Sequence, residues 1–415
     1  MFLVNSGSIF QFWWLLPLIL SILGLFLSVW IIVPAPTFFL LPFGVCASEV
    51  SPWLIVINAI GVSLAVGIAL ASVFWISPSW LSNFIVVCSL LGLLLSCLPL
   101  FQFSATNQRF SAEMERVLGT DYLQDLPQLQ VLMRAKPLAI ADVFRGIPTK
   151  DVRIDRGITF ASPDGVDLKL NVYRPLLSGK YPALIIIYGG AWRTGSPDDY
   201  EKFSCYIAAR GYSAIAIDYR HAPEYKFPSQ LEDVETALRY IQAHADELEV
   251  GLERVAVMGR SAGGHLASLA AYRQDAIALR AVVNYYGPVD LAKGYYDPPV
   301  PDPIDIQTIL NNFLGGTPQE LPELYQQASP INYLRPNLPP SLLIYAGRDH
   351  LVQAKFGRQL YEKLRAMDNP AIWLEIPWAE HAFDAVFFGV SNQLALYYTE
   401  RFLAWVLNDT TRAIE

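Results

Sequence analysis

The sequence predicts two parts of different fold class: an all-α transmembrane region of three helices, followed by an α/β domain with a mostly parallel sheet and helices on both faces. Three observations support this prediction. Up to Gln108 the only charged residue is Glu49, and there is no Lys, Arg or His. From Val152 onward, short β-rich runs alternate with helical ones, which is typical of a parallel sheet covered by helices. The length of 415 residues leaves room for two or more domains.

A segment with a single charge cannot build the surface of a soluble globular domain, so we expect residues 1–103 to lie in lipid. Three apolar runs, 10–33, 53–76 and 81–103, each exceed the roughly 20 helical residues that cross about 30 Å of hydrocarbon. Tryptophans stand at the ends of these runs, as in an aromatic belt: Trp13, Trp14, Trp30, Trp53, Trp75 and Trp80. The alternative, buried core helices of a soluble protein, is disfavoured by the scarcity of charge.

The shorter apolar stretch 38–47 contains Pro42 and Gly44, so we expect an interfacial or re-entrant segment there and not a fourth span. A cleaved signal peptide is disfavoured because no basic residue precedes the first run and further spans follow it. Three spans place the two termini on opposite sides of the membrane. The first basic residues, Arg109 and Arg116, come just after the third span, and the positive-inside rule then places the C-terminal domain in the cytoplasm.

The composition also limits the possible partners. A formal net charge of −8 argues against nucleic acid and against polybasic docking onto anionic lipid. The four cysteines, at 46, 88, 97 and 205, provide neither a disulfide framework nor a thiolate metal cluster, because three of them lie in the membrane part. We therefore expect no metal and no nucleic-acid partner, and the oligomeric state stays open.

Residues 104–150 are expected to form an amphipathic connector, with a helix over 111–118, that lies at the membrane surface or against the next domain. The α/β domain is expected over 151–415. Its strands are expected near 158–160, 168–173, 183–188, 213–218, 254–258, 281–286, 342–346 and 372–376, and its helices near 200–210, 229–247, 352–366 and 391–407. The gap at 287–338 is too long for a simple crossover, so it is expected to contain an insertion near the mouth of a site.

The most informative motif is Gly259-Arg260-Ser261-Ala262-Gly263, which lies between the apolar run 255–258 and the helix-prone run 266–271. A strand, a tight turn flanked by glycines and a helix, in that order, form a nucleophile elbow, in which the serine stands on a strained turn. The five-residue pattern alone arises by chance, but the flanking strand and helix make chance much less probable. The alternative is a glycine-rich helix start without chemistry.

A nucleophilic serine needs a base and an acid that orients the base. Behind a nucleophile elbow the chain order is serine, acid, histidine. Asp349 follows the strand-like run 342–346, and His381 follows the run 372–376. We therefore predict that Ser261 is the nucleophile, His381 the base and Asp349 the acid.

Other acids and histidines fit less well. Asp384 and Glu380 are too close in sequence to His381 to reach its far ring nitrogen easily. His244 falls inside a charged helical segment and is expected to be exposed. His265 lies on the first turn after the elbow and is expected to be packed or to cap the helix.

Serine chemistry also needs backbone N–H groups that stabilise an oxyanion. Gly189, Gly190 and Ala191 follow directly on a buried strand-like run, where glycines let the main chain approach a substrate carbonyl. The N–H of Ala262, at the start of the helix, would be the second contribution. We expect these residues to form the oxyanion hole, and Trp192 with the insertion to shape the substrate pocket. A tight turn without a role is the alternative.

Four segments together resemble a known family: Tyr188–Trp192, Asp218–Glu224, Phe227-Pro228 and Gly259–His265. They are similar to the hormone-sensitive-lipase-like carboxylesterases, and more closely to the branch with feruloyl-esterase-like, kynurenine-formamidase-like and isoprenylcysteine-methylesterase-like hydrolases. The resemblance covers about 155–407. It implies the α/β-hydrolase fold, the same nucleophile, acid, base and oxyanion loop, and a bracing role for the loop at 218–228.

Two residues depart from the family pattern. Tyr188 occupies the first position of the oxyanion motif, where the family usually has His. Arg260 precedes the serine, where Asp, Gly or Gln is frequent. We expect the first to alter how the oxyanion loop is supported and the second to alter the charge near the elbow.

These patterns predict a membrane-anchored serine carboxylesterase or lipase-like hydrolase that works through an acyl-enzyme without cofactor or metal. Its substrate would be a small-molecule or lipid-like ester, and the lipid bilayer its main partner. Two alternatives stay open. The same fold and residues could serve an amidase, formamidase or peptidase, or the fold could be reused as a non-catalytic membrane receptor or scaffold.

Overall fold

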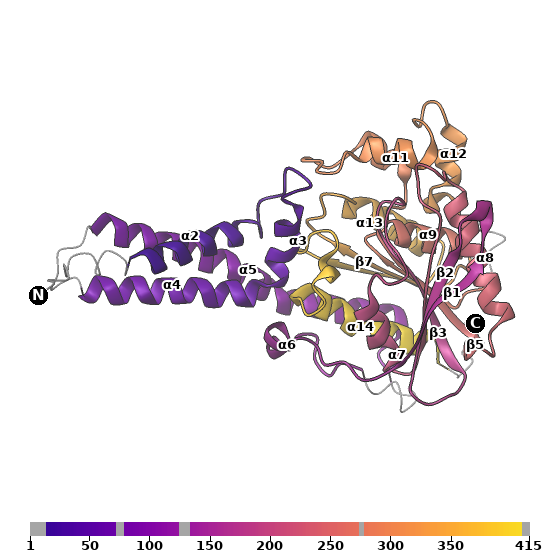
Figure 1. Ribbon diagram of the computed structural model, residues 1–415, viewed down its shortest axis with the longest axis horizontal. Helices are drawn as coiled ribbons and strands as arrows, with labels where there is room; N and C mark the ends of the chain where they lie inside the picture. Colours follow the sequence, from indigo (N-terminus) through magenta and orange to yellow (C-terminus); the bar gives the residue numbers. More distant parts are fainter. Residues whose placement is uncertain (1–13, 72–78, 124–132, 274–277, 409–415) are drawn as a thin grey trace, which may run out of the picture.

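The computed structural model describes residues 14–71, 79–123, 133–273 and 278–408. The molecule is elongated, with a bundle of long helices at one end and a layered α/β body at the other (Figure 1). Helix α5 (Ser79–Leu118) begins in the bundle and ends against the body.

The body is built on one eight-stranded sheet with the strand order β1-β2-β4-β3-β5-β6-β7-β8. The pairs β1–β2 and β2–β4 are antiparallel, and all pairs from β4 to β8 are parallel. The strands are β1 Arg153–Ala161, β2 Leu168–Arg174, β3 Tyr181–Ile187, β4 Ser213–Ile217, β5 Val250–Arg260, β6 Ala281–Tyr285, β7 Ser341–Ala346 and β8 Ala371–Ile376. The mostly parallel sheet confirms the predicted α/β class.

Helices cover both faces of the sheet (Figure 1), so the central strands are buried and mostly apolar. Every residue of β4, β6 and β7 is buried. Helices α7 and α14 lie on one face, and α8, α9 and α13 lie on the other (Figure 1). Their bounds are α7 Glu201–Ala208, α8 Ser229–Ala243, α9 Ala262–Tyr272, α13 Ala354–Ala366 and α14 Val390–Val406.

The segment between β6 and β7 forms three short helices that pack on one another: α10 Leu291–Tyr296, α11 Ile306–Leu314 and α12 Pro322–Gln327. They correspond to the insertion expected over 287–338. Short 3₁₀ turns complete the body at Pro163–Gly165 (η3), Pro330–Asn332 (η4) and Phe383–Ala385 (η5).

In the bundle, small residues let α2 (Leu15–Val29), α4 (Ser51–Ala71) and α5 approach one another closely. A Cβ atom on Gly24 or Gly92 would overlap the side-chain oxygen of Asn58. The amide nitrogen of Asn58 donates to the hydroxyl of Ser28 over 3.0 Å and to the carbonyl of Leu54 over 2.8 Å, so these buried donors are paired within the bundle.

One described helix, Trp80–Leu118, is long and apolar enough to cross a membrane by itself. The helices Leu41–Glu49 (α3) and Ser51–Gly67 satisfy the same criteria only together, as a pair bent by 84°, and Leu15–Val29 is apolar but shorter. The predicted region of three transmembrane helices is therefore not confirmed. Parts of the predicted spans, 10–13 and 72–76, lie outside the described residues.

The third predicted span was expected to end at residue 103, with a separate helix over 111–118. Helix α5 instead runs without interruption for 40 residues to Leu118. No Gly or Pro lies between 104 and 118, and polar residues alone do not end a helix; the chain leaves the helix at Gly119, which has a φ of +90°. The second half of α5 packs against β8 and α14, so this helix belongs to both parts of the molecule.

The described parts of the expected connector after α5 also pack against both parts of the molecule. Arg134 donates to Gln393 of α14 over 2.7 Å. The short helix α6 (Ile140–Arg145) lies beside α4, where the indole N–H of Trp53 donates to the carbonyl of Val143 over 3.0 Å. Residues 124–132 lie outside the described part of the chain.

Candidate active site

Ser261 stands on a sharp turn between β5 and α9, as the elbow motif predicts. Its φ of 51° and ψ of −123° are rarely adopted by a residue with a side chain, which is backbone strain of the kind found at reactive groups. The turn is so tight that a Cβ atom on Gly259 would overlap the carbonyl of Gly263, and one on Gly263 would overlap the carbonyl of Ile187. Both glycines are therefore required by the geometry.

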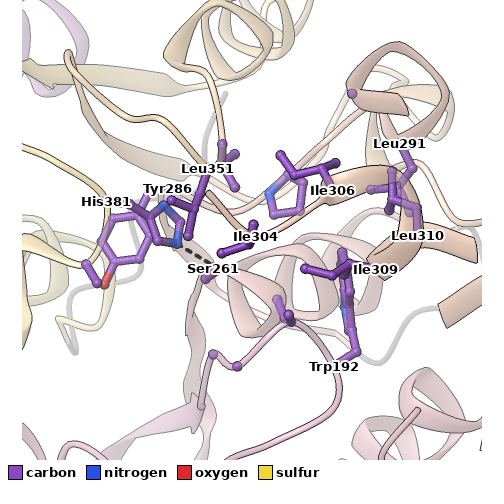
Figure 2. A pocket seen from close by; sticks show the side chains of 18 of the residues that line it. Trp192, Ser261, Tyr286, Leu291, Ile304, Ile306, Ile309, Leu310, Leu351 and His381 are labelled. Carbon is purple, nitrogen blue, oxygen red and sulfur yellow. Dashed lines mark hydrogen bonds between the residues drawn. The ribbon is translucent and has the colours of Figure 1, made fainter. Parts of the chain in front are cut away.

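The structure brings the three candidate catalytic residues together at the carboxyl ends of three strands. His381 Nε2 lies 2.9 Å from Ser261 Oγ, a hydrogen bond drawn in Figure 2. On the other side of the ring, His381 Nδ1 lies 2.8 Å from Asp349 Oδ2. This arrangement lets the imidazole take a proton from the hydroxyl while the carboxylate holds the tautomer.

The acid is held firmly by its own loop. Asp349 Oδ1 accepts hydrogen bonds from the backbone N–H groups of Leu351 and Val352, over 2.8 and 2.7 Å. The side chain of Asp349 is fully buried. Burial by itself lowers the pKa of His381, but the charge and hydrogen bond of Asp349 outweigh it and raise that pKa above its ordinary value. The ring therefore gains a proton more readily than a free histidine does.

Glu380, which the sequence suggests only as a competing acid, links the loops of Asp349 and His381. Its carboxylate accepts the backbone N–H groups of His350 over 2.8 Å and of His381 over 3.0 Å. It also pairs with the ring Nδ1 of His350 over 2.6 Å, which raises the pKa of that histidine. Two adjacent pairs in the sequence, Asp349-His350 and Glu380-His381, are the signal that could have revealed this link.

Arg260, the residue before Ser261, forms a buried ion pair that the sequence did not predict. Its guanidinium binds the carboxylate of Asp384, and the two side chains are only 1% and 2% exposed. It also lies between the rings of Tyr200 and Phe203, each 4.2 Å away. Asp384 further accepts the hydroxyl of Tyr286, whose ring packs 4.6 Å from that of His381. The arginine is thus neutralised inside the body and adds no free charge at the elbow.

The candidate oxyanion loop lies beside the nucleophile. A Cβ atom on Gly189 would lie 3.1 Å from Ser261 Cβ, so the glycine allows close approach. Gly190 and Ala191 have φ values of +128° and +53°. Among the hydrogen bonds of the described residues, none uses the N–H of Gly190, Ala191 or Ala262, which leaves these three donors free for a ligand.

Tyr188 supports this loop where the family usually has histidine. Its hydroxyl donates to Asp218 over 2.6 Å and lies 2.9 Å from His221 Nε2. Its ring stacks on that of Tyr219, with the centroids 4.4 Å apart. Residues of the 218–228 loop therefore contact the oxyanion loop directly.

A cavity of about 340 Å³ opens beside Ser261 and His381 (Figure 2). Trp192 forms one wall: its ring stacks on Phe313 at 4.1 Å, and its N–H donates to His265 Nδ1 over 3.1 Å. His265 donates in turn to the carbonyl of Ala328 over 2.6 Å, and burial lowers its pKa to about 4. The apolar side chains of the lining come mainly from the insertion: Val289, Leu291, Ile304, Ile306, Ile309 and Leu310.

No cluster of three or more His, Cys, Asp or Glu side chains that could hold a metal ion occurs in the described parts of the chain. The site therefore consists of a hydrogen-bonded Ser–His–Asp chain, free backbone donors and an apolar cavity.

Comparison with known proteins finds similarity to esterases and to one family model. Residues 170–364 match the family model described as BD-FAE. Esterase LipC of Mycobacterium tuberculosis is 34% identical over 219 residues, which are 49% of this chain and 53% of that protein. The probable carboxylic ester hydrolase LipM of the same organism is 30% identical over 244 residues, 55% of this chain and 56% of that protein. The chain thus matches only about half the length of these relatives.

Solved structures show the same fold. A truncated carbohydrate esterase from gut microbiota superposes with a TM-score of 0.52 at 21% identity, covering 61% of this chain and 96% of that chain. A phosphonylated form of Thermogutta terrifontis esterase 2 has a TM-score of 0.50 at 25% identity, covering 62% of this chain and 94% of that chain. With the eight-stranded sheet and the elbow, these matches show that the body of this chain has the α/β-hydrolase fold, and its sequence is similar to that of esterases over about half of their length.

Proposed function

We propose that this protein is a membrane-anchored serine carboxylesterase that cleaves carboxylic esters through an acyl-enzyme. The observation that carries the proposal is the hydrogen-bonded chain from Ser261 Oγ through the ring of His381 to the buried Asp349, with distances of 2.9 and 2.8 Å. The esterase relatives support the reaction class.

In the proposed mechanism, Ser261 Oγ attacks the ester carbonyl carbon while His381 Nε2 takes the hydroxyl proton. The negative oxygen of the tetrahedral intermediate accepts hydrogen bonds from the N–H groups of Gly190, Ala191 and Ala262, the last at the start of helix α9. The protonated His381 then gives its proton to the leaving alcohol, and the acyl-enzyme remains. Water, deprotonated by the same ring, attacks the acyl-enzyme and releases the acid and free Ser261.

The membrane anchor is also part of the proposal. It rests on the nearly charge-free sequence before Arg109 and on the apolar helix Trp80–Leu118. Large apolar side chains of the bundle face outward, among them Leu94 on α5, which is 62% exposed. We further propose that the membrane region spans 1–103 and that the catalytic domain spans 151–415. We place this domain on the cytoplasmic side because the first arginines, Arg109 and Arg116, lie in the last turns of α5, next to the body.

A substrate panel on the purified full chain tests the function. Nitrophenyl esters, aryl amides and N-formyl substrates are compared between the wild-type protein and Ser261→Ala. We expect ester hydrolysis that falls by at least a thousandfold in the variant. Faster hydrolysis of amides or N-formyl substrates would replace the esterase with an amidase or formamidase, and a wild-type protein without any hydrolysis would favour a receptor or scaffold.

A further inference from the structure

The N-terminal region contributes to the catalytic cavity itself. Phe38, in the connection between α2 and α3, lines the cavity together with residues of the body. The same connection is attached to the acid loop, because the guanidinium of Arg348 donates to the carbonyl of Ile32. Leu351, which also lines the cavity, packs against the small apolar cluster of Ala35, Leu41 and Val45. The mouth of the cavity therefore lies where the bundle meets the body.

The second side of this mouth comes from the loop between α10 and α11. Pro299 of this loop lines the same cavity as Phe38. In Figure 1 the loop extends from the body toward the connection between α2 and α3. The tips of both segments are apolar and exposed: Phe38 is 66%, Phe39 83% and Val300 90% exposed. We call Phe38, Phe39, Pro299 and Val300 the apolar collar.

Exposed apolar residues beside a cavity, here Phe38, Phe39 and Val300, are typical of a surface that meets a membrane or a partner. A membrane fits best here because the collar continues directly from α2, a helix without any charged residue. Helix α6 lies at the same end of the bundle (Figure 1), and its exposed side chains Ile140 and Phe144 are also apolar. The collar thus lies at the level where a bilayer around the bundle would end.

The cavity also limits what can enter. Its volume of about 340 Å³ lies near the lower end of the roughly 300–1,000 Å³ typical of small-molecule sites, so it encloses only part of a large lipid. Besides His381, the cavity lining contains one basic and one acidic residue, Arg193 and Asp290. The formal charges of these two residues are opposite and cancel. A cavity without net charge favours a neutral ester over a fatty-acid anion or an ammonium compound.

We propose that the substrate is a neutral lipophilic ester held in the bilayer, whose acyl end enters the cavity past the apolar collar while the rest stays among the lipids. This inference rests on the proposed esterase function and adds its substrate class and entry route. Phe39 and Val300 would insert into the interface, and neither lines the cavity.

The test uses the full chain in phosphatidylcholine vesicles and two esters: water-soluble 4-nitrophenyl acetate and a long-chain fluorogenic ester dissolved in the bilayer. The variants are Phe39→Asp and Val300→Asp, made singly; Val300 is so exposed that its substitution removes almost no packing. The control is Leu177→Asp, because Leu177 is 79% exposed but lies between β2 and β3, at the end of the sheet opposite to the site.

We expect each collar variant to lower kcat/KM for the bilayer ester by roughly tenfold or more, since a carboxylate is costly to bring into lipid, and to leave acetate hydrolysis within about twofold. Leu177→Asp should change neither rate. Unchanged hydrolysis of the bilayer ester in both collar variants would overturn the inference, as would equal losses for both esters with Val300→Asp. A wild-type protein that cleaves neither ester would instead contradict the proposed esterase function.

Discussion

Arg260 and Asp384 form a buried ion pair that joins the strand before Ser261 to the loop of His381. The two side chains are 1% and 2% exposed, and the residues lie directly before Ser261 and three positions after His381. Through Tyr286, which donates to Asp384 and packs on the ring of His381, the pair also supports the imidazole. The pair therefore connects the two segments that carry Ser261 and His381.

Removing one partner of this pair should destabilise the protein strongly, because the other charge stays buried without compensation. We expect Asp384→Asn to cost roughly 3–5 kcal/mol of unfolding free energy, which lowers the melting temperature by on the order of 10 °C. Thermal unfolding of the detergent-solubilised chain measures this. The control is Glu375→Gln, which removes the ion pair of Arg358 and Glu375 near the surface. We expect this variant to lose less than about 1 kcal/mol of unfolding free energy. Equal shifts in the two variants would contradict the role of the buried pair.

The pH dependence of the reaction should report the raised pKa of His381. The ring must be neutral to take the proton of Ser261, so kcat/KM should fall as the pH drops through the pKa of His381. Because Asp349 and Glu380 both raise that pKa, Asp349→Asn and Glu380→Gln should move the acidic limb to lower pH. A pH profile of kcat/KM on a soluble ester checks this. An acidic limb that stays at the same pH in both variants would show that another group titrates.

Tyr188 should act through the position of the oxyanion loop. Tyr188→Phe removes the hydroxyl that contacts Asp218 and His221. Each of these groups then has one hydrogen bond fewer, which lowers the unfolding free energy by about 1–3 kcal/mol. We expect kcat to fall by roughly tenfold with little change in KM, because the free N–H groups contact the oxyanion and not the ground state. Steady-state kinetics on one soluble ester measure both constants.

A matched control for this prediction is Tyr181→Phe. The hydroxyl of Tyr181 donates over 2.6 Å to the carbonyl of Leu177, at the opposite end of the sheet. We expect the kinetic constants of the Tyr181→Phe variant to equal those of the wild-type protein. A loss of kcat in Tyr181→Phe as large as in Tyr188→Phe would mean that the effect is not specific to the oxyanion loop.

The positions of the candidate catalytic residues could be predicted because they depend on strand ends. Ser261, Asp349 and His381 each follow an apolar run that is a buried parallel strand in the structure, and such strands end at one edge of a sheet. The partner of Arg260 could not be predicted, because Asp384 lies 124 residues away and nothing in its local sequence marks it as a buried counter-ion.

The contact between the helical region and the site also could not be predicted from the sequence. The connection around Phe38 has an apolar composition that fits lipid and protein equally well, so its contact with the cavity depends on tertiary packing alone. Likewise, the end of an apolar run at residue 103 predicts the end of a helix, whereas α5 continues to Leu118 because no Gly or Pro lies between 104 and 118.

Covalent labelling measures directly whether Ser261 is a reactive nucleophile. The full chain is treated with a fluorophosphonate probe, digested and analysed by mass spectrometry. We expect one phosphonylated residue, Ser261, with labelling abolished in Ser261→Ala and strongly slowed in His381→Ala. A wild-type protein that is folded but never labelled, or a label on another residue that persists in Ser261→Ala, would contradict this expectation.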